Sequence, residues 1–408
     1  MTVFGLQRTA IVPNVTLRDA AQQPWDAIVV GAGPAGALAA RQLAGQGAAV
    51  LLVDKMSFPR WKLCGCCLNG AALAALASVG LGDLPQRLSA RPLHRWRLCA
   101  AAGQAVCPLP AGVSLSRESF DTALVEEATG AGAAFLDRTQ AMMADAGQHF
   151  CEVQLSRESQ HAVARSRVLL AADGLAGRLL DNHPEFRPAI RPNSPLGAGT
   201  ALVDGPNVYE DGTIFMACGR GGYVGLVRLE DGRIDIAAAL DLSAARTCGG
   251  PAALAERILH EVRLPIPRGI RQAHWRGTAA LTRRRARVAG QRIFVLGDAA
   301  TYVEPFTGEG MAWAVTSAIA VAPLAAEGID RWSAELATRW SKLHRRLVGA
   351  RQPICQIVGR VLKHPGLAGA AVLVLAQAPW LAAPLIRAVN APARLHCDTD
   401  QKGGVGVP

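Results

Sequence analysis

Three cysteines stand close together in a short glycine-bearing stretch, KLCGCCLNG, at residues 62–70. Cys64, Cys66 and Cys67 could bind a metal, do redox chemistry or line a pocket. A zinc site usually takes four ligands from separated Cys or His pairs, and the sequence has no second cluster with that spacing. A disulfide between such close neighbours would close a strained ring. We therefore predict no metal, and expect small thiol side chains packed in a pocket, with a redox-active thiol as the alternative.

A glycine-rich turn lies between two hydrophobic segments nearer the N-terminus. WDAIVVGAGPAGALAARQLAGQGAAVLLVDK predicts a buried strand over residues 27–30, a helix rich in small residues, and a second strand over residues 49–53. Three glycines fill a G-x-G-x-x-G pattern: Gly31, Gly33 and Gly36. Such a turn lets a pyrophosphate approach the N-terminus of the helix, which here begins around Pro34 and Ala35. Asp54 ends the second strand, where its carboxylate can accept ribose hydroxyls, so we predict a dinucleotide-binding unit.

A second strand, turn and helix follow much later in the chain. RIFVLGDAATYVEPFTGEGMAWAV predicts a strand over residues 293–296, then Asp298, then a proline- and glycine-bearing turn into a helix that starts near residue 308. This arrangement is similar to the second FAD fingerprint of the glutathione-reductase-like flavoproteins. The resemblance implies that Asp298 holds the ribityl chain and that the turn brings backbone N–H groups to the flavin. The turn positions that match are Pro305, Gly308, Gly310 and Met311. A helix N-terminus at this place would stabilise negative charge on reduced flavin.

A helix is predicted between these two fingerprints. SRESFDTALVEEATGAGAAF has Ser116 as its N-cap and three residues on one apolar face, which are Phe120, Leu124 and Ala128. It resembles the arginine-start helix of FAD monooxygenases and geranylgeranyl reductases. The resemblance implies that Arg117 lies close to the cofactor; the alternative is a solvated arginine in a first turn.

Two loops carry further resemblance to the same superfamily. Lys62 and Cys64 match the K-x-C-G loop of the geranylgeranyl-reductase-like branch, which passes by the flavin. The stretch VLLAADGLAGRLL resembles the ADG segment of the aromatic hydroxylases at Asp173 and Gly174. The arginine usual in this segment is replaced by Leu180, which argues against a nicotinamide-binding role.

The segment from 213 to 240 predicts a three-stranded meander. The resemblance to these flavoproteins implies that this sheet covers the flavin. The segment aligns with the Tyr-x-Trp-x-Phe-Pro element of prenyl reductases at Tyr223, but Gly225 replaces the tryptophan, and Val227 and Arg228 replace Phe-Pro. These differences argue against a true geranylgeranyl substrate. Flavin-dependent halogenases share the architecture, but residues 71–110 contain no lysine for their catalytic position, so we do not expect halogenation.

The predicted fold is α/β: a glutathione-reductase-like Rossmann FAD domain with an inserted antiparallel-sheet substrate domain and a helical C-terminal region. The FAD-binding domain is expected to be discontinuous, over 25–90, 112–185 and 276–330. The substrate domain is expected over 91–111 and 186–275, and a helical cap over 331–408. The resemblance covers roughly residues 25–330.

Charge and hydropathy give expectations for partners. The net charge of +11 over 408 residues favours anionic partners such as a pyrophosphate cofactor, an acidic carrier protein or a membrane surface. Aromatic residues make up only 5% of the chain and no nucleic-acid motif occurs, so nucleic acid is not an expected partner. The N-terminus lacks the order of a signal peptide, so we expect a cytoplasmic protein. The uncharged run over residues 366–386 is broken by prolines and predicts two apolar helices that cap a greasy pocket or rest on a membrane.

Three functions remain open because the cofactor would carry the chemistry in each. The first, which we favour, is an NAD(P)H-dependent monooxygenase acting on a hydrophobic, polyketide- or lipid-like small molecule. The others are a reductase or dehydrogenase of carbon–carbon bonds and a noncatalytic electron-transfer flavoprotein. No second glycine fingerprint provides a nicotinamide domain, so NAD(P)H would bind transiently. The catalytic residues stay unassigned, with Tyr223 and Cys66 as candidates.

Overall fold

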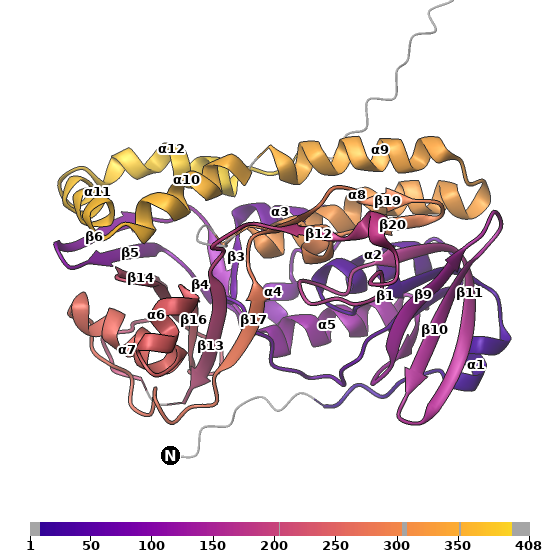
Figure 1. Ribbon diagram of the computed structural model, residues 1–408, viewed down its shortest axis with the longest axis horizontal. Coiled ribbons are helices and arrows are strands. Elements are labelled where there is room, and N and C mark those ends of the chain that lie inside the picture. The colour runs from indigo at the N-terminus through magenta and orange to yellow at the C-terminus, as the bar shows by residue number, and fades with distance from the viewer. Residues whose placement is uncertain (1–8, 204, 304–307, 351, 394–408) are drawn as a thin grey trace, which may run out of the picture.

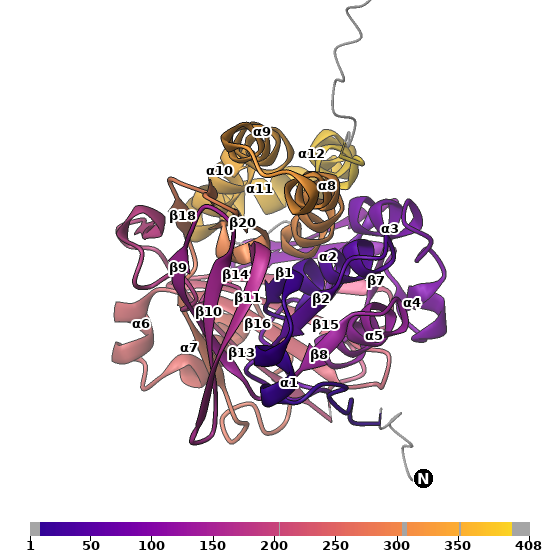
Figure 2. The same cartoon turned by 90° about the vertical axis from the view of Figure 1, so that its right-hand side faces the viewer.

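The computed structural model describes residues 9–203, 205–303, 308–350 and 352–393 (Figure 1). Two large sheets occupy the two ends of the elongated molecule, and helices from the C-terminal part of the chain run along one side of both. Figure 2, turned by 90°, shows these orange and yellow helices as a layer above the sheets. The fold is therefore mixed α/β with a helical C-terminal region, as predicted.

The first sheet has eight strands and contains the predicted glycine-turn unit. Its main path runs through β19 (Ala289–Gly290), β20 (Ile293–Val295), β11 (Gln160–Ala171), β1 (Trp25–Val30), β2 (Val50–Val53) and β8 (Ala134–Leu136). β9 (Gln140–Ala146) and β10 (Cys151–Arg157) extend β11 on the antiparallel side. β1 pairs in parallel with both β2 and β11, and all of β2 is buried, as expected for a strand covered on both faces. The three strands predicted here are confirmed, with ends that differ by one or two residues.

Helices built from small residues cover this sheet. α2 (Pro34–Ala44) packs against α5 (Arg117–Gly130) and α8 (Gly310–Asp330). In α5 the Ser116 side chain accepts a hydrogen bond from the N–H of Ser119, and the predicted apolar face is fully buried, so cap and face are confirmed. α8 is long and apolar enough to cross a membrane, but 72% of its most apolar window is buried, as is common for a core helix. Shorter helices flank this region: α1 (Leu17–Gln22), α3 (Gly70–Ala77) and α4 (Leu84–Arg87).

The second sheet has seven strands and includes the predicted meander. β14 (Thr213–Gly219), β15 (Gly222–Arg228) and β16 (Ile234–Leu240) are its centre, so the meander is confirmed. On one side it continues through β5 (Arg95–Ala100) and β6 (Gly103–Pro108), and on the other through β13 (Leu196–Leu202) and β17 (Arg276–Ala280). The pairing of β14 with β5 is parallel and joins segments far apart in the chain.

The two faces of the second sheet are covered differently. One face packs on α7 (Pro251–Glu261), with α6 (Leu242–Thr247) beside it, through an aliphatic cluster that includes Leu254 and Ile258. The other face contributes Met216 and Tyr223 to a cluster shared with the C-terminal helices. The second face is therefore the one next to the glycine turn and the C-terminal layer.

The C-terminal helices after α8 are α9 (Ala334–His344), α10 (Gln352–Lys363), α11 (Pro365–Gln377) and α12 (Ala383–Asn390). α11 and α12 confirm the two predicted apolar helices. α11 packs on β5 and β6, whereas α12 reaches back to α3, where the Asn390 side chain accepts the N–H of Gly70 at 2.8 Å. This contact closes the C-terminal layer over the cysteine loop.

Two small sheets complete the described structure. β3 (Cys67–Asn69), β7 (Gly112–Ser114) and β4 (Arg91–Pro92) form one, and β12 (Pro188–Ile190), β18 (Arg283–Arg285) and β21 (Thr301–Tyr302) form the other. β3 begins within the cysteine stretch, so the loop is anchored on its C-terminal side. The domain boundaries drawn from the sequence stay a prediction.

Candidate active site

The glycine turn between β1 and α2 is sterically fixed. A Cβ atom at Gly31, where φ is +101°, would lie 2.3 Å from the carbonyl oxygen of Ala172, and one at Gly36 would lie 1.8 Å from that of Gly31. At Gly33 a Cβ atom would meet only the ends of two flexible side chains, Arg117 Nη2 at 3.6 Å and Arg60 Nη2 at 3.9 Å. The first two glycines are therefore required by the protein itself, while Gly33 leaves space for a ligand at the start of α2.

An ion-pair network braces the turn. The Asp54 carboxylate accepts the N–H of Ala32 at 2.7 Å and lies 3.9 Å from Arg60. Arg60 also contacts Asp121 at 3.1 Å, and Arg117 donates two hydrogen bonds of 2.7 Å to Asp121. Burial opposes the charged form of Asp121, but Arg117 and Arg60 hold the pKa of that carboxyl below its ordinary value. The network fixes Arg117 at the edge of the opening.

Lys62 and Asp298 also line the opening, and each shifts the pKa of the other. Burial, with Arg117 and Arg60 nearby, lowers the pKa of Lys62. Burial also raises the pKa of Asp298, and Lys62 and Arg117 partly offset this. A Cβ atom at Gly174 would lie 3.3 Å from Lys62 Nζ, so the lysine rests against the turn that follows β11. The sequence-predicted loops at 62 and 174 are thus brought together.

The cysteine stretch forms one wall of the site. Cys64 and Cys67 line the pocket, whereas Cys66 is buried beside them in a left-handed backbone conformation with φ of 50°. A hydrogen bond from Cys66, with help from Arg117, lowers the pKa of Cys64 to about 6 despite its burial. The same hydrogen bond, together with burial, raises the pKa of Cys66. Every cysteine in the described ranges is a free thiol, and no His, Cys, Asp or Glu cluster there is arranged to hold a metal.

One buried acid was missed by the sequence reasoning. Asp235 lies on β16, lines the pocket opposite the cysteine loop, and is only 1% exposed. Neither of its carboxyl oxygens has a hydrogen-bond partner in the described part of the chain. Burial and the nearby charge of Cys64 raise its pKa well above the ordinary value. The available signal was the lone charged residue in the otherwise apolar strand IDIAAAL.

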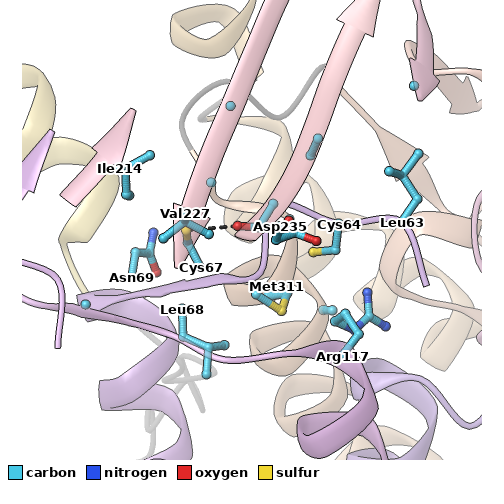
Figure 3. A pocket seen from close by; sticks show the side chains of 18 of the residues that line it. Leu63, Cys64, Cys67, Leu68, Asn69, Arg117, Ile214, Val227, Asp235 and Met311 are labelled. Atoms are coloured by element: carbon cyan, nitrogen blue, oxygen red, sulfur yellow. Dashed lines mark hydrogen bonds between the residues drawn. The ribbon is translucent and has the colours of Figure 1, made fainter. Parts of the chain in front are cut away.

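These walls enclose a cavity with about 1860 Å³ of empty space, including its open mouth (Figure 3). Figure 3 shows the cysteine loop, Arg117 and Met311 on one side and the strands carrying Val227 and Asp235 on the other. The aliphatic part of the lining combines Ile214 from the second sheet, Leu93 and Leu109 from the segments just before β5 and just after β6, and Leu385, Ile386 and Val389 from α12. The cavity therefore has two parts. We call the part formed by the start of α2 with Lys62, Arg117 and Asp298 the charged cradle, and the part lined by these aliphatic side chains the hydrophobic chamber.

Most of the residues predicted for the site line this cavity: Gly33, Pro34, Ala35, Lys62, Cys64, Arg117, Tyr223, Asp298, Gly308, Gly310 and Met311. The others in the described ranges lie behind the lining residues: Gly31, Gly36, Asp54 and Cys66. Pro305 lies outside the described residues. The structure thus gathers segments from across the chain, while the role given to each residue stays a prediction.

Comparisons with known proteins agree with this geometry. A family model described as an FAD binding domain matches residues 25–336. The menaquinone reductase of Mycobacterium tuberculosis is 29% identical over 349 residues, covering 78% of this chain and 79% of that protein. Digeranylgeranylglycerophospholipid reductase 2 of Methanopyrus kandleri is 26% identical over 323 residues, covering 75% and 78%. The structure of p-nitrophenol 4-monooxygenase from Pseudomonas putida superposes with a TM-score of 0.74 at 15% identity, covering 91% of this chain and 99% of that one, which is a likeness of fold.

Proposed function

The chain belongs to the FAD-binding-domain family and is an FAD-dependent oxidoreductase, and from this premise we propose that it reduces a carbon–carbon double bond of a lipid-like molecule. NAD(P)H is proposed as the transient reductant. The observation that carries the proposal is the aliphatic chamber joined to the charged cradle, because an apolar substrate bound in that chamber would lie next to the residues expected at the flavin.

The residues of the cradle fit FAD. The space at Gly33 and the start of α2 suits a pyrophosphate, and Arg117 and Lys62 provide positive charge beside it. Asp298 lines the same cavity and would accept ribityl hydroxyls there, and Gly310 and Met311 begin α8 beside it. Bound FAD would supply two-electron chemistry to the chamber. The residues of the chain would hold the cofactor, exclude water from the substrate and position groups that can donate a proton.

The relatives support a lipid substrate. Both are named as reductases, and the substrates in their names are menaquinone and digeranylgeranylglycerophospholipid. In this chain the side chains of Leu385, Ile386 and Val389 from α12 form part of the chamber wall. Each methylene buried there contributes about 0.8 kcal/mol, so a long aliphatic chain would bind far better than a short one.

Monooxygenation is the second candidate, and the wall of the second sheet favours it. Gly225 and Val227 line the cavity where the prenyl-reductase element has tryptophan and phenylalanine, so the substrate meets a different surface. A small residue at position 225 leaves room for a ring rather than a thin prenyl chain. The two reactions give different products, because reduction adds two hydrogens and monooxygenation adds one oxygen.

We also propose that the protein works in the cytoplasm at a membrane surface. Apolar side chains are exposed along α11 and the turn after it: Leu367, Leu373, Val374, Trp380 and Leu381. This segment contains no charged residue and is flanked by Lys363 and Arg387. An apolar segment with basic flanks suits an anionic bilayer, where each cation near the surface adds about 1 kcal/mol. The substrate would then enter from the lipid phase beside α12.

The test is an anaerobic assay with FAD-loaded protein, NADPH or NADH, and vesicles of an anionic phospholipid that contain menaquinone or a polyprenyl lipid. The expected result is a product heavier by two hydrogens, formed without oxygen. A product heavier by one oxygen, formed only in air, would support the second candidate instead. No product with any lipid under either condition would contradict both.

A further inference from the structure

Asp235 is an unusual residue for its place in the fold. It lies in β16, which pairs with β13 on one side and β15 on the other, and the rest of that strand is apolar. An unsatisfied polar group in the interior costs about 1 to 3 kcal/mol, and a charged one costs more. A carboxyl group whose two oxygens both lack a partner in the described structure is therefore not explained by stability. Because Asp235 also lines the cavity, its available partner is what the cavity binds.

The groups around Asp235 come from three elements. Cys64, Cys66 and Cys67 face it from the cysteine loop, as Figure 3 shows for Cys64 and Cys67. Arg233, which directly precedes β16, lowers the pKa of Asp235, and Glu118 of α5 raises it. Cys66 lies beside both Asp235 and Cys64 and shifts the pKa of each. The acid and the thiols thus form one cluster next to the cradle.

Within this cluster, Cys64 and Asp235 differ in protonation state. At neutral pH the pKa of about 6 makes Cys64 a thiolate, held by the Cys66 hydrogen bond and by Arg117. Burial and the Cys64 charge keep the proton on Asp235, whose pKa is raised well above the ordinary value. Two neighbouring groups whose surroundings drive their pKa values apart are typical of acid and base assignments in enzymes. Of these two groups, only Asp235 carries a proton to give.

We propose that Asp235 is a catalytic residue that donates the proton in the reduction of a carbon–carbon double bond, an inference that rests on the proposed function. The O–H bond of Asp235 breaks, and its proton forms a C–H bond with one carbon of the double bond. The other carbon receives the hydrogen and the two electrons supplied by the FAD-dependent reduction. The carboxylate that remains lies beside the Cys66 thiol and regains its proton from solvent before the next turnover.

The first test does not need turnover. Infrared difference spectra of wild type minus Asp235→Asn, without substrate, should contain the carbonyl band of a protonated carboxylic acid that shifts in D₂O. Asp145→Asn, which changes an exposed carboxyl on β9, is the matched control and should give no such band at neutral pH. Absence of the band from the Asp235 difference would overturn the inference.

The second test measures turnover and FAD binding together. Asp235→Asn keeps the shape of the side chain but cannot release a proton, so reduction should fall by about 100-fold or more while FAD affinity stays unchanged. Asp145→Asn should keep both values. Reduction by Asp235→Asn at the wild-type rate would overturn the inference alone, whereas a wild type that reduces no lipid would contradict the proposed function.

A second variant keeps the inference testable if Asp235→Asn does not fold. Because the Cys64 charge raises the pKa of Asp235, Cys64→Ala should move the pH midpoint of the protonated-acid band downward. Cys64 is not among the groups that shift the pKa of Asp173 or Asp298, the other acids in the described ranges whose pKa burial raises, so the band component that moves belongs to Asp235. A band with the same midpoint in both proteins would contradict the cluster.

Discussion

The two sides of the cavity differ in what determines their residue types. On the cradle side, Gly31 and Gly36 sit where any side chain would collide with backbone atoms, so local geometry dictates the residue type. On the wall side, the seven-stranded sheet accepts many side chains, and yet β16 carries Asp235 with both carboxyl oxygens unpartnered among the described residues. The residue types of the cradle are therefore fixed by the backbone, whereas Asp235 in the wall is not required by the fold and so points to a function.

The largest expected effect comes from breaking the cradle. In Gly36→Val the new side chain would begin 1.8 Å from the Gly31 carbonyl oxygen, so the variant should be purified colourless or unfolded. Gly130→Ala is the control, because a Cβ atom there meets nothing within 4 Å. Absorbance at the flavin band and thermal unfolding check both. Yellow, stable Gly36→Val protein would show that the turn is not the cofactor site.

Gly33→Ala sharpens this contrast. Its Cβ atom would make only ordinary contacts, with Arg117 Nη2 at 3.6 Å and Arg60 Nη2 at 3.9 Å, so the fold should survive. The methyl group would occupy space proposed for the pyrophosphate, so FAD affinity should fall. If the melting temperature of the apoprotein falls as much as that of Gly36→Val, the space serves packing instead of a ligand.

The next effect concerns the carboxyl group of the cradle. Asp298→Ala removes a charge-assisted hydrogen bond to the ribityl chain, worth about 1.5 to 3 kcal/mol, so FAD affinity should fall about tenfold to a hundredfold. Titration of the apoprotein with FAD, followed by flavin fluorescence, measures it. Asp145→Ala, on the exposed face of β9, should leave the dissociation constant unchanged. Equal affinity in wild type and Asp298→Ala would remove Asp298 from the cradle.

A smaller effect is expected outside the cavity. The double variant Leu373→Ser, Trp380→Ser removes two apolar side chains that are 54% and 70% exposed, so binding to anionic vesicles should weaken by at least about tenfold. FAD affinity should not change. Val163→Ser, which removes an exposed apolar side chain from β11, is the control for vesicle sedimentation. Added salt should weaken the wild-type binding further. If the double variant sediments with the vesicles as well as the wild type does, α11 faces solvent and does not contact the membrane.

The smallest expected effect is a change in the pH dependence of the reactivity of Cys64, which lies between the wall and the cradle. Alkylation of Cys64 should be slow below pH 6 and fast above it, because its pKa is lowered to about 6. In Cys66→Ala the stabilising hydrogen bond is lost, so the midpoint should rise toward the ordinary thiol value of about 8.5. FAD affinity should be unchanged in this variant and in Cys66→Ser, Cys67→Ser. Mass spectrometry of the modified peptide follows the reaction, and an unmoved midpoint would remove Cys66 from the cluster.

Sequence reasoning found the cradle because its signals are local. The glycine spacing, the cap at Ser116 and the strand before Asp298 each depend on a few neighbouring residues, and the structure confirms the elements that carry them. The wall was found only in part. The meander was predicted from alternation and turns, but the parallel pairing of β14 with β5 joins Thr213 to Arg95 and leaves no local trace. The role of Asp235 could not be predicted in the same way, because the burial of a side chain depends on how the strands assemble into a sheet.

The central claim is that FAD held in the cradle exchanges electrons with a lipid in the chamber. The direct measurement is flavin absorbance in an anaerobic cuvette, in which protein bleached by one equivalent of NADPH receives menaquinone or a polyprenyl lipid in vesicles. The absorbance should return as lipid is added, with formation of a product heavier by two hydrogens. Absorbance that stays bleached with lipid and returns only with air would contradict this claim.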